Sequence, residues 1–272
     1  MTTIVLIPAF NEARTLADVV RGALLYADAL VVVDDGSTDG TARTIASPAV
    51  QVVTHARNEG KSASLVDGFV HALACGATRV VTMDADGQHA AADIPRLLRA
   101  ADAHPDAIVI GARVRRRANA PRARRVANWL ADFGVSWASG HRVLDSQSGQ
   151  RVYPAAVLRA LDLAQLSRDG FTLESEIVVA AARVGSRTVS VPIDAVYAAI
   201  ARKSYFRPLR HISAIFAMLA RNVVGDAFKL AGLWTSVRER AVTFDERADA
   251  PVHTLHAPLV HEAQSMHVAQ KP

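Results

Sequence analysis

Short apolar runs alternate with segments of helical periodicity from residue 3 to about residue 112. The runs cover residues 4–8, 29–34, 50–54, 79–83 and 107–110, and their length and β-branched content are typical of strands. Strands that alternate with helices are joined by right-handed crossovers and form a mainly parallel sheet with helices on both faces. The pattern therefore predicts an α/β fold.

The pattern changes after residue 113, where strict alternation ends. We expect a helix over 126–139, a polar loop over 144–150 that enters a short strand, a helix over 171–184 and a strand over 187–192. Farther on, apolar residues recur at helical spacing from Ile212 to Leu230, and the chain beyond residue 238 is polar. We therefore predict one domain over 1–205, an amphipathic helical segment over 206–238 and a disordered tail over 239–272.

Composition fits a globular protein, because half of the 272 residues are apolar. No apolar run reaches the length of a membrane span, and no basic leader with an apolar core precedes the first strand. Cys75 is the single cysteine, which excludes an internal disulfide and fits a reducing compartment. We expect Cys75 to be buried as a small apolar residue, and we expect the protein to be cytoplasmic.

Positive charge is concentrated in two stretches, although the formal net charge is only +5. Seven arginines fall between residues 113 and 125, and Arg202, Lys203, Arg207 and Arg210 form a second cluster. Such patches indicate a phosphate-bearing partner, and a solvated face is the simpler alternative. The arginine run has no interleaved aromatics and no nucleic-acid-binding motif, so we expect no nucleic-acid partner.

Each of the five predicted strands is followed by polar, charged or glycine-bearing residues. They are Asn11 and Glu12, then Asp34 to Gly40, then Arg57 to Lys61, then Asp84 and Asp86, and finally Gly111 to Arg113. The carboxyl ends of parallel strands meet at one edge of a sheet, where open α/β sheets bind their ligands. Turns alone do not require so many charged groups, so we predict a binding cleft at this edge.

Two carboxylates and a carboxamide follow the fourth strand in the stretch Met83-Asp84-Ala85-Asp86-Gly87-Gln88-His89. These oxygen donors suit Mg²⁺ or Mn²⁺, with part of the coordination left to substrate phosphates. The alternative is a turn in which Asp86 caps a helix that starts near Ala90. The sequence has neither a G-x-G-x-x-G after the first strand nor a G-x-x-x-x-G-K-[ST], so it supports neither a dinucleotide fingerprint nor a P-loop.

Four motifs, in their order along the chain, resemble those of the family 2 glycosyltransferases. They are Ile7-Pro8-Ala9-Phe10-Asn11-Glu12, Val33-Asp34-Asp35-Gly36-Ser37-Thr38-Asp39-Gly40-Thr41, Asn58-Glu59-Gly60-Lys61 and the stretch from Met83 to His89. Within that family the chain is most similar to the branch of dolichyl-phosphate mannosyltransferases and bacterial polyprenyl-phosphate glycosyltransferases. The resemblance covers residues 3–205 and implies a GT-A fold, with a Rossmann-like, mainly parallel sheet.

The resemblance also implies a site for a nucleotide-diphosphate sugar donor. The nucleoside would contact Pro8, Ala9, Glu12 and Asp35, with Lys61 nearby, and Asp84, Asp86 and Gln88 would hold the Mg²⁺ or Mn²⁺ that bridges the diphosphate. The stretch 197–207, which contains Arg202 and Lys203, resembles the late basic segment that closes over the donor diphosphate.

On the acceptor side, Arg113 occupies the place where the lipid-phosphate branch has an arginine that faces the acceptor phosphate, and Arg122 or Arg124 would assist it. The stretch from Asp145 to Tyr153 resembles the family's loop of Asp, Ser, Gly and Arg before an aromatic, with Gln150 in place of the usual Phe. The implied acceptor is a polyprenyl phosphate or another lipid-linked molecule. Such an acceptor requires a membrane surface or a membrane partner, on the cytoplasmic face of the inner membrane.

The charges suggest how such a reaction would proceed. A metal on Asp84 and Asp86, together with Arg202 or Lys203, would neutralise the diphosphate leaving group. A phosphate acceptor is already anionic and needs no general base, whereas a hydroxyl acceptor needs one, for which Asp145 and Glu174 are the candidates. We expect direct displacement with inversion at the anomeric carbon.

Two other functions compete with this interpretation. A non-catalytic module would bind a nucleotide sugar or a lipid head group and recruit a partner through residues 208–233. The intact Asp84, Asp86 and Lys61 argue against that module. A phosphatase with an aspartyl nucleophile also carries Asp-x-Asp after a strand, but the surrounding motifs do not fit it.

Overall fold

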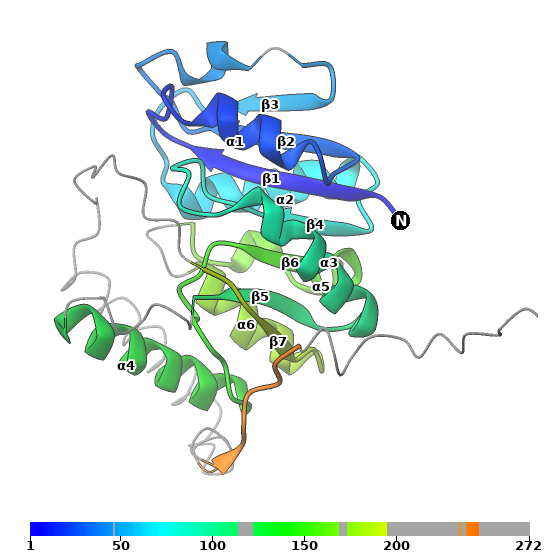
Figure 1. Cartoon of the computed structure of the whole chain (residues 1–272), viewed down its shortest axis with the longest axis vertical. Helices are drawn as coiled ribbons and strands as arrows, with labels where there is room; N and C mark the ends of the chain where they lie inside the picture. The colour runs from blue at the N-terminus through cyan, green and yellow to red at the C-terminus, as the bar shows by residue number, and fades with distance from the viewer. Residues whose placement is uncertain (46, 114–121, 169–172, 195–233, 235–237, 245–272) are drawn as a thin grey trace, which may run out of the picture.

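The computed structural model describes residues 1–45, 47–113, 122–168, 173–194, 234 and 238–244. Within these residues a seven-stranded sheet has the order β3-β2-β1-β4-β6-β5-β7 (Figure 1). The strands are β1 (Thr3–Ala9), β2 (Ala29–Asp34), β3 (Val50–Thr54), β4 (Arg79–Thr82), β5 (Ile108–Ala112), β6 (Arg151–Pro154) and β7 (Thr188–Pro192). All seven lie where the sequence predicted a strand.

Every strand except β6 runs in the same direction. Strand β1 pairs in parallel with β2 and β4, β2 with β3, and β5 with β7. Strand β6 is antiparallel to both β4 and β5 and lies between them. The mainly parallel sheet is therefore confirmed, and the polar segments that follow β1 to β5 lie at one edge.

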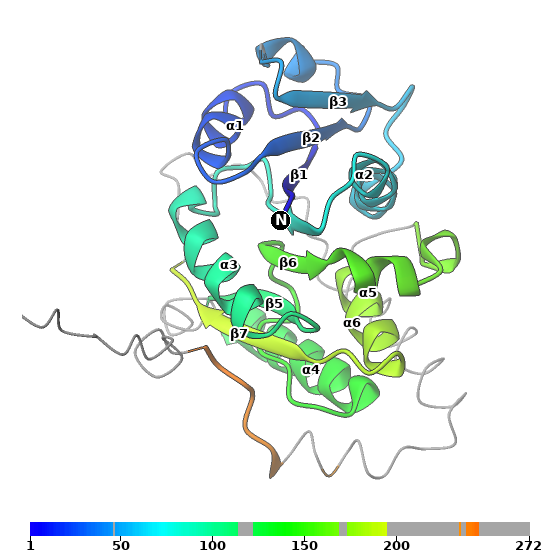
Figure 2. The same cartoon turned by 90° about the vertical axis from the view of Figure 1, so that its right-hand side faces the viewer.

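Helices cover both faces of the sheet, as predicted. They are α1 (Leu16–Ala23), α2 (Lys61–Ala74), α3 (Ile94–Ala103), α4 (Arg122–Ser139), α5 (Ala155–Ala160) and α6 (Leu173–Arg183), with short 3₁₀ turns η1 (Thr41–Thr44), η2 (Ala91–Asp93) and η4 (Leu163–Gln165). Figure 2 shows α1 and α3 on one face and α2, α5 and α6 on the other. Helix α4 packs against α6. Among the described residues no helix is long and apolar enough to cross a membrane.

Two apolar cores hold the layers together, one on each face of the sheet. Successive side chains of a strand point to opposite faces, so β1 contributes to both cores. Ile4 and Leu6 belong to the core that contains Phe69 of α2, whereas Val5 and Ile7 belong to the core that contains Leu16 of α1. Burial of each such side chain stabilises the fold by about 1.5–3 kcal/mol, which fixes the strands and hence the positions of their polar ends.

The prediction that Cys75 is buried was wrong. Cys75 is the C-cap residue of α2 and is exposed, because the helix ends at Ala74. Gly76 follows with a φ of 81°, a left-handed conformation that turns the chain away from the helix axis.

The prediction of a disordered tail from residue 239 onward was wrong for its first residues. The N–H of Ser190 in β7 donates to the carbonyl of Val242 at 2.8 Å, and the N–H of Phe244 donates to the carbonyl of Ser190 at 2.9 Å. Phe244 is only 6% exposed and packs into the core on the α1 side. This segment satisfies backbone groups of the edge strand β7 and buries an aromatic ring. Residues 245–272, and residues 206–238 apart from 234 and 238, lie outside the described residues.

Candidate active site

The segments that follow β1 and β2 are joined by hydrogen bonds. Asn11 has a φ of 56°, and its side-chain oxygen accepts the N–H of Thr38 at 2.9 Å. The N–H of Asn11 donates to Ser37 Oγ, and the N–H of Glu12 donates to Thr41 Oγ1, both at 2.9 Å. The candidate nucleoside contacts on β1 and on the β2 loop therefore share one wall of the site.

Asp35 is more deeply buried, and makes more hydrogen bonds within the protein, than the sequence indicated. It is 2% exposed, and its carboxylate accepts the N–H groups of Glu59 and Gly60, each at 2.8 Å. It also accepts a hydrogen bond from His55 Nδ1 at 2.8 Å, and His55 Nε2 lies 3.2 Å from the carboxylate of Asp67. Asp35 thus ties the end of β2 to the start of α2. Sequence analysis missed His55 and Asp67, because neither belongs to a recognisable motif.

Lys61, the first residue of α2, joins two carboxylates from distant parts of the chain. Its Nζ lies 2.7 Å from Asp84 Oδ1 and 2.9 Å from Glu174 Oε1. Burial alone would lower the pKa of Lys61, but the charges of Asp84 and Glu174 raise this pKa well above its ordinary value. Burial would raise the pKa of Asp84, but the charge of Lys61 holds it well below its ordinary value. Lys61 and Asp84 are therefore both charged at neutral pH.

Two further contacts fix Asp84. The N–H of Asp84 donates to His89 Nδ1 at 3.3 Å, and burial lowers the pKa of His89, which favours the neutral ring. Gly149 passes so close to Asp84 that a Cβ at position 149 would lie 2.6 Å from Asp84 Oδ2. Thr82 Oγ1 also donates to the carbonyl of Gly149 at 2.8 Å, so the loop before β6 is held directly against the carboxylate.

Asp86 forms a tight turn rather than a helix cap. Its Oδ1 accepts the N–H of Gln88 at 2.9 Å, while Ala90 is the N-cap of η2, so the capping alternative was wrong. Gln88 is exposed. No group of three or more His, Cys, Asp or Glu side chains suited to a metal occurs among the described residues. Two carboxylates on one turn still fit a Mg²⁺ or Mn²⁺ ion, because such ions take most of their remaining ligands from phosphates and water.

Arg113, which follows β5, forms a bidentate pair with Asp145 of the loop before β6. Arg113 Nε donates to Asp145 Oδ2 at 2.8 Å, and Nη2 donates to Oδ1 at 2.9 Å. The backbone N–H of Arg113 donates to the same carboxylate at 2.9 Å. Asp145 is 2% exposed, whereas the Arg113 side chain is 29% exposed. The carboxylate therefore orients a guanidinium that reaches the surface.

Two buried charges support the loop that carries Asp145, and sequence analysis missed both roles. Asp132 on α4 accepts the N–H of Ser146 at 2.7 Å and that of Asp145 at 3.3 Å. Arg151 is fully buried and donates to the carbonyls of Ser146, Ser148 and Glu174. The only signals in the sequence were a carboxylate within a mostly apolar helix and an arginine within a strand.

The two glutamates of α6 have different partners, because residues two positions apart do not share a helix face. Glu174 is 8% exposed and pairs with Lys61, whereas Glu176 accepts the N–H of Ser167 at 2.8 Å. Gln150 is fully buried, and its Nε2 donates to the carbonyl of Ala90 at 3.0 Å, so an amide replaces the expected aromatic without opening the site.

Four predicted site residues are not placed by the structure. Arg202 and Lys203 lie outside the described residues, and Arg122 and Arg124 belong to α4 but their side chains are not described. Among the residues that the structure describes, Lys61 pairs with Asp84 and Glu174, and Arg113 pairs with Asp145.

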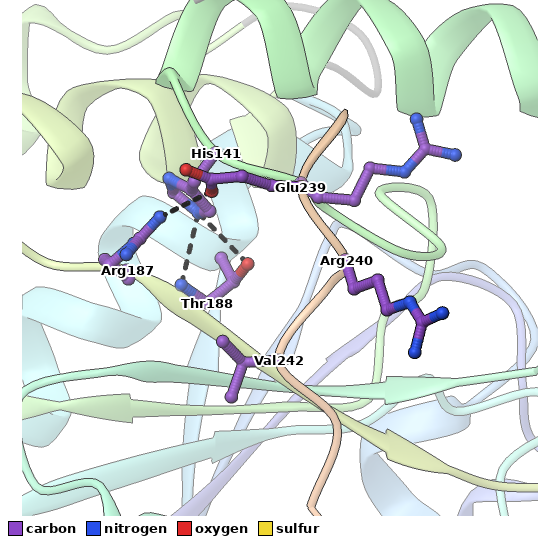
Figure 3. Close-up of a pocket in the computed structure, with 7 residues that line it drawn as sticks. His141, Arg187, Thr188, Glu239, Arg240 and Val242 are labelled. Carbon is purple, nitrogen blue, oxygen red and sulfur yellow. Dashed lines mark hydrogen bonds and ion pairs between the residues drawn. The ribbon is translucent and has the colours of Figure 1, made fainter. Parts of the chain in front are cut away.

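A pocket of about 190 Å³ lies at the opposite end of β7, beside Thr188 (Figure 3). His141 Nε2 accepts the N–H of Thr188 at 3.2 Å, and burial lowers the pKa of His141. Arg187 and Glu239 form an ion pair of 2.9 Å across the pocket. The ion pair holds Glu239 beside the start of β7, and the pocket lies away from the carboxyl edge that carries Asp84.

The chain resembles known proteins in sequence over most of its length. A family model described as glycosyl transferase family 2 matches residues 4–159. An undecaprenyl-phosphate mannosyltransferase of Micrococcus luteus is 33% identical over 204 residues, which cover 71% of this chain and 83% of that protein. A polyprenol monophosphomannose synthase of Mycolicibacterium smegmatis is 34% identical over 206 residues, covering 70% and 76% of the two chains.

Solved structures share the fold. Glucosyl-3-phosphoglycerate synthase from Mycobacterium tuberculosis, in complex with UDP, has a TM-score of 0.57 at 21% identity and covers 81% of this chain and 79% of its own. Mannosyl-3-phosphoglycerate synthase from Rubrobacter xylanophilus has a TM-score of 0.60 at 18% identity, with coverage of 91% and 80%. The predicted GT-A fold is confirmed. With the family model matching more than half of the chain and these sequence relatives, the protein belongs to the family 2 glycosyltransferases.

Proposed function

We propose that the protein transfers a sugar from a nucleotide-diphosphate sugar to a polyprenyl phosphate, with inversion at the anomeric carbon. One observation carries the proposal: a single loop, 144–149, contacts both the Asp84 corner and Arg113. A donor diphosphate and an anionic acceptor bound at these two places would meet across that loop. Two of the sequence relatives are, by name, transferases that use undecaprenyl phosphate or make polyprenol monophosphomannose, which supports the acceptor class.

On the donor side, we assign the divalent cation to Asp84, Asp86 and Gln88. When bound there, Mg²⁺ or Mn²⁺ would neutralise the diphosphate leaving group. A structure of the M. tuberculosis glucosyl-3-phosphoglycerate synthase that contains both Mn²⁺ and UDP supports a divalent cation at this kind of site. Pro8, Ala9, Glu12 and Asp35 would line the nucleoside, Lys61 would meet the diphosphate, and Arg202 and Lys203 would close over it.

On the acceptor side, Arg113 would bind the acceptor phosphate, since its guanidinium reaches the surface and offers a planar donor fork. Asp145 is engaged with Arg113 and Glu174 with Lys61, so each carboxylate already neutralises a cation. This arrangement supports a phosphate acceptor, which attacks without a general base. A lipid acceptor also requires the protein to work at a membrane surface, for which we propose the cytoplasmic face of the inner membrane.

The test is an acceptor comparison with purified protein, Mn²⁺ and a panel of radiolabelled UDP- and GDP-linked hexoses. We expect labelled lipid with a polyprenyl phosphate and none with the matching polyprenol, and we expect the product to have the opposite anomeric configuration to the donor. Retention of configuration, or transfer to the alcohol alone, would overturn the proposal. Donor binding without any transfer would favour the non-catalytic module instead.

A further inference from the structure

The orientation of Arg113 depends on an unusual backbone conformation at Asp145. Asp145 has a φ of 51°, in the left-handed region that non-glycine residues rarely adopt. In this conformation its carboxylate meets both Nε and Nη2 of Arg113. Something must hold the backbone there, because an unrestrained aspartate would prefer a different conformation.

Asp132 supplies that restraint from outside the loop. It lies on α4 and is 3% exposed, and its two carboxylate oxygens accept the N–H groups of Asp145 and Ser146. Two consecutive N–H groups are thus fixed by one buried charge on a rigid helix. Hydrogen bonds to a charged group are stronger than those between neutral groups, and the Asp132 carboxylate is shielded from water.

We propose that Asp132 is a positioning residue for the acceptor, which acts through Asp145 to orient Arg113. The inference rests on the proposed function, in which Arg113 binds the acceptor phosphate. Asp132 itself contacts neither substrate, since it is buried beneath the loop. Its removal should therefore weaken acceptor binding selectively and leave the donor corner at Asp84 intact.

The same helix offers a matched control. Ser136 lies one turn farther along α4, is fully buried, and accepts the N–H of Val143 at 3.0 Å through its Oγ. Ser136 therefore also links the chain before β6 to α4, but it does so at Val143, two residues before Asp145. Ser136→Ala removes that link and the hydrogen bond from Ser136 Oγ to the backbone carbonyl of Asp132, but it removes neither hydrogen bond that the Asp132 carboxylate accepts from the loop.

The first experiment compares Asp132→Asn with Ser136→Ala in steady-state transfer to a polyprenyl phosphate. Asparagine keeps the volume of aspartate but turns an NH₂ group toward one of the two N–H groups. We expect the KM for the acceptor to rise about tenfold in Asp132→Asn, the loss of one hydrogen bond to a charge, with the donor KM within about twofold. Ser136→Ala should leave both KM values unchanged. Equal effects of the two variants on the acceptor KM would overturn the proposal.

A double-mutant cycle tests whether Asp132 acts through Arg113. In an Arg113→Lys background the bidentate fork is already lost. Adding Asp132→Asn should then change the acceptor KM by less than about twofold, because both substitutions remove the same interaction. If the fold-increase in acceptor KM in the double variant equalled the product of the two single fold-increases, Asp132 would act by another route and the proposal would be overturned.

A measurement on the protein without substrates separates this inference from the proposed function. The ¹⁵N resonance of Arg113 Nε, assigned by its loss in Arg113→Lys, should show an N–H protected from water exchange in the parent and in Ser136→Ala. It should exchange rapidly in Asp132→Asn, or in Asp132→Glu if the asparagine variant does not fold. Unchanged protection in the variant would contradict the positioning role, whether or not the protein uses a lipid phosphate.

Discussion

Lys61 Nζ lies 2.7 Å from Asp84 Oδ1, so the first residue of α2 is paired with the first carboxylate after β4. Lys61 follows β3 and Asp84 follows β4, two parallel strands with β2 and β1 between them, so the two residues reach the same edge although 23 positions separate them in the sequence. Glu174 of α6 completes the cluster from the second half of the chain, at 2.9 Å from the same ammonium. The cluster therefore joins three segments that are far apart in the sequence and that no single motif connects.

Replacing Lys61 by methionine should destabilise the protein, because Asp84 and Glu174 would face each other without their shared cation. We expect the free energy of unfolding to fall by about 2 kcal/mol, less than for a fully buried ion pair because 22% and 29% of the Lys61 and Asp84 side chains are exposed. Lys61→Arg keeps the charge and should lose less than half as much. Urea denaturation measures the free energy of unfolding of both variants. An equal loss in the two variants would mean that packing, and not charge, stabilises this cluster.

A methyl group at position 149 should disturb the donor corner. In Gly149→Ala the new Cβ would lie 2.6 Å from Asp84 Oδ2 and 2.8 Å from Oδ1, so the carboxylate must move. We expect calorimetry to show the affinity for whichever nucleoside diphosphate the parent binds, UDP or GDP with Mn²⁺, reduced about tenfold. Gly22→Ala makes the same change on α1, where the nearest atom is a methyl carbon at 3.1 Å, and should leave the affinity unchanged. If Gly149→Ala bound the nucleotide as tightly as the parent, the assignment of Asp84 to the donor site would be wrong.

Much of this edge was predictable from the sequence, and the reasons are physical. The apolar runs of β1 to β5 are long enough to be read as strands, and parallel strands place their carboxyl ends together. That rule alone places Asp84, Asp35 and Lys61 at the same edge of the sheet. Family resemblance then supplied the expected chemistry of each motif.

The supporting residues were not predictable, because each acts through tertiary packing. Asp132 reads as an ordinary polar position of a helix, and only the folded chain shows that it faces Asp145 and Ser146. The family-like loop includes Arg151, but nothing in the sequence indicated that this side chain is fully buried and donates to three backbone carbonyls. Phe244 lies in a polar stretch without periodicity, so nothing local indicated its place in the core.

Phe244 should anchor the segment 238–244 to the domain. Its ring is 6% exposed, so Phe244→Ala should lower the free energy of unfolding by about 3 kcal/mol. Val242→Ala, in the same segment but 44% exposed, should change it by less than about 0.5 kcal/mol. Chemical denaturation of the two variants measures the difference. Similar small losses would indicate that this segment contributes little to the fold.

His141 should make stability fall in mild acid. Burial lowers its pKa in the folded protein below the unfolded value of about 6.5, so the unfolded state binds the extra proton more readily. The stability that His141 contributes is therefore present above pH ~6.5 and is lost as pH falls through the folded pKa. In His141→Gln, whose amide oxygen can still accept the N–H of Thr188, the drop in Tm between pH 7 and pH 5 should be smaller than in the parent. An identical drop in both proteins would exclude His141 as its source.

We propose that the carboxylates of Asp84 and Asp86 and the guanidinium of Arg113 serve one transfer reaction. The most direct measurement follows radiolabelled sugar from a nucleotide-diphosphate sugar into organic-extractable polyprenyl phosphate, in Mn²⁺, with the parent and with Asp86→Asn. Our account predicts labelled lipid with the parent and a loss of about 100-fold or more with the variant, since a metal that neutralises the leaving group lowers the barrier by several kcal/mol. Equal transfer by the two proteins, or no labelled lipid from any donor that the parent binds, would contradict it.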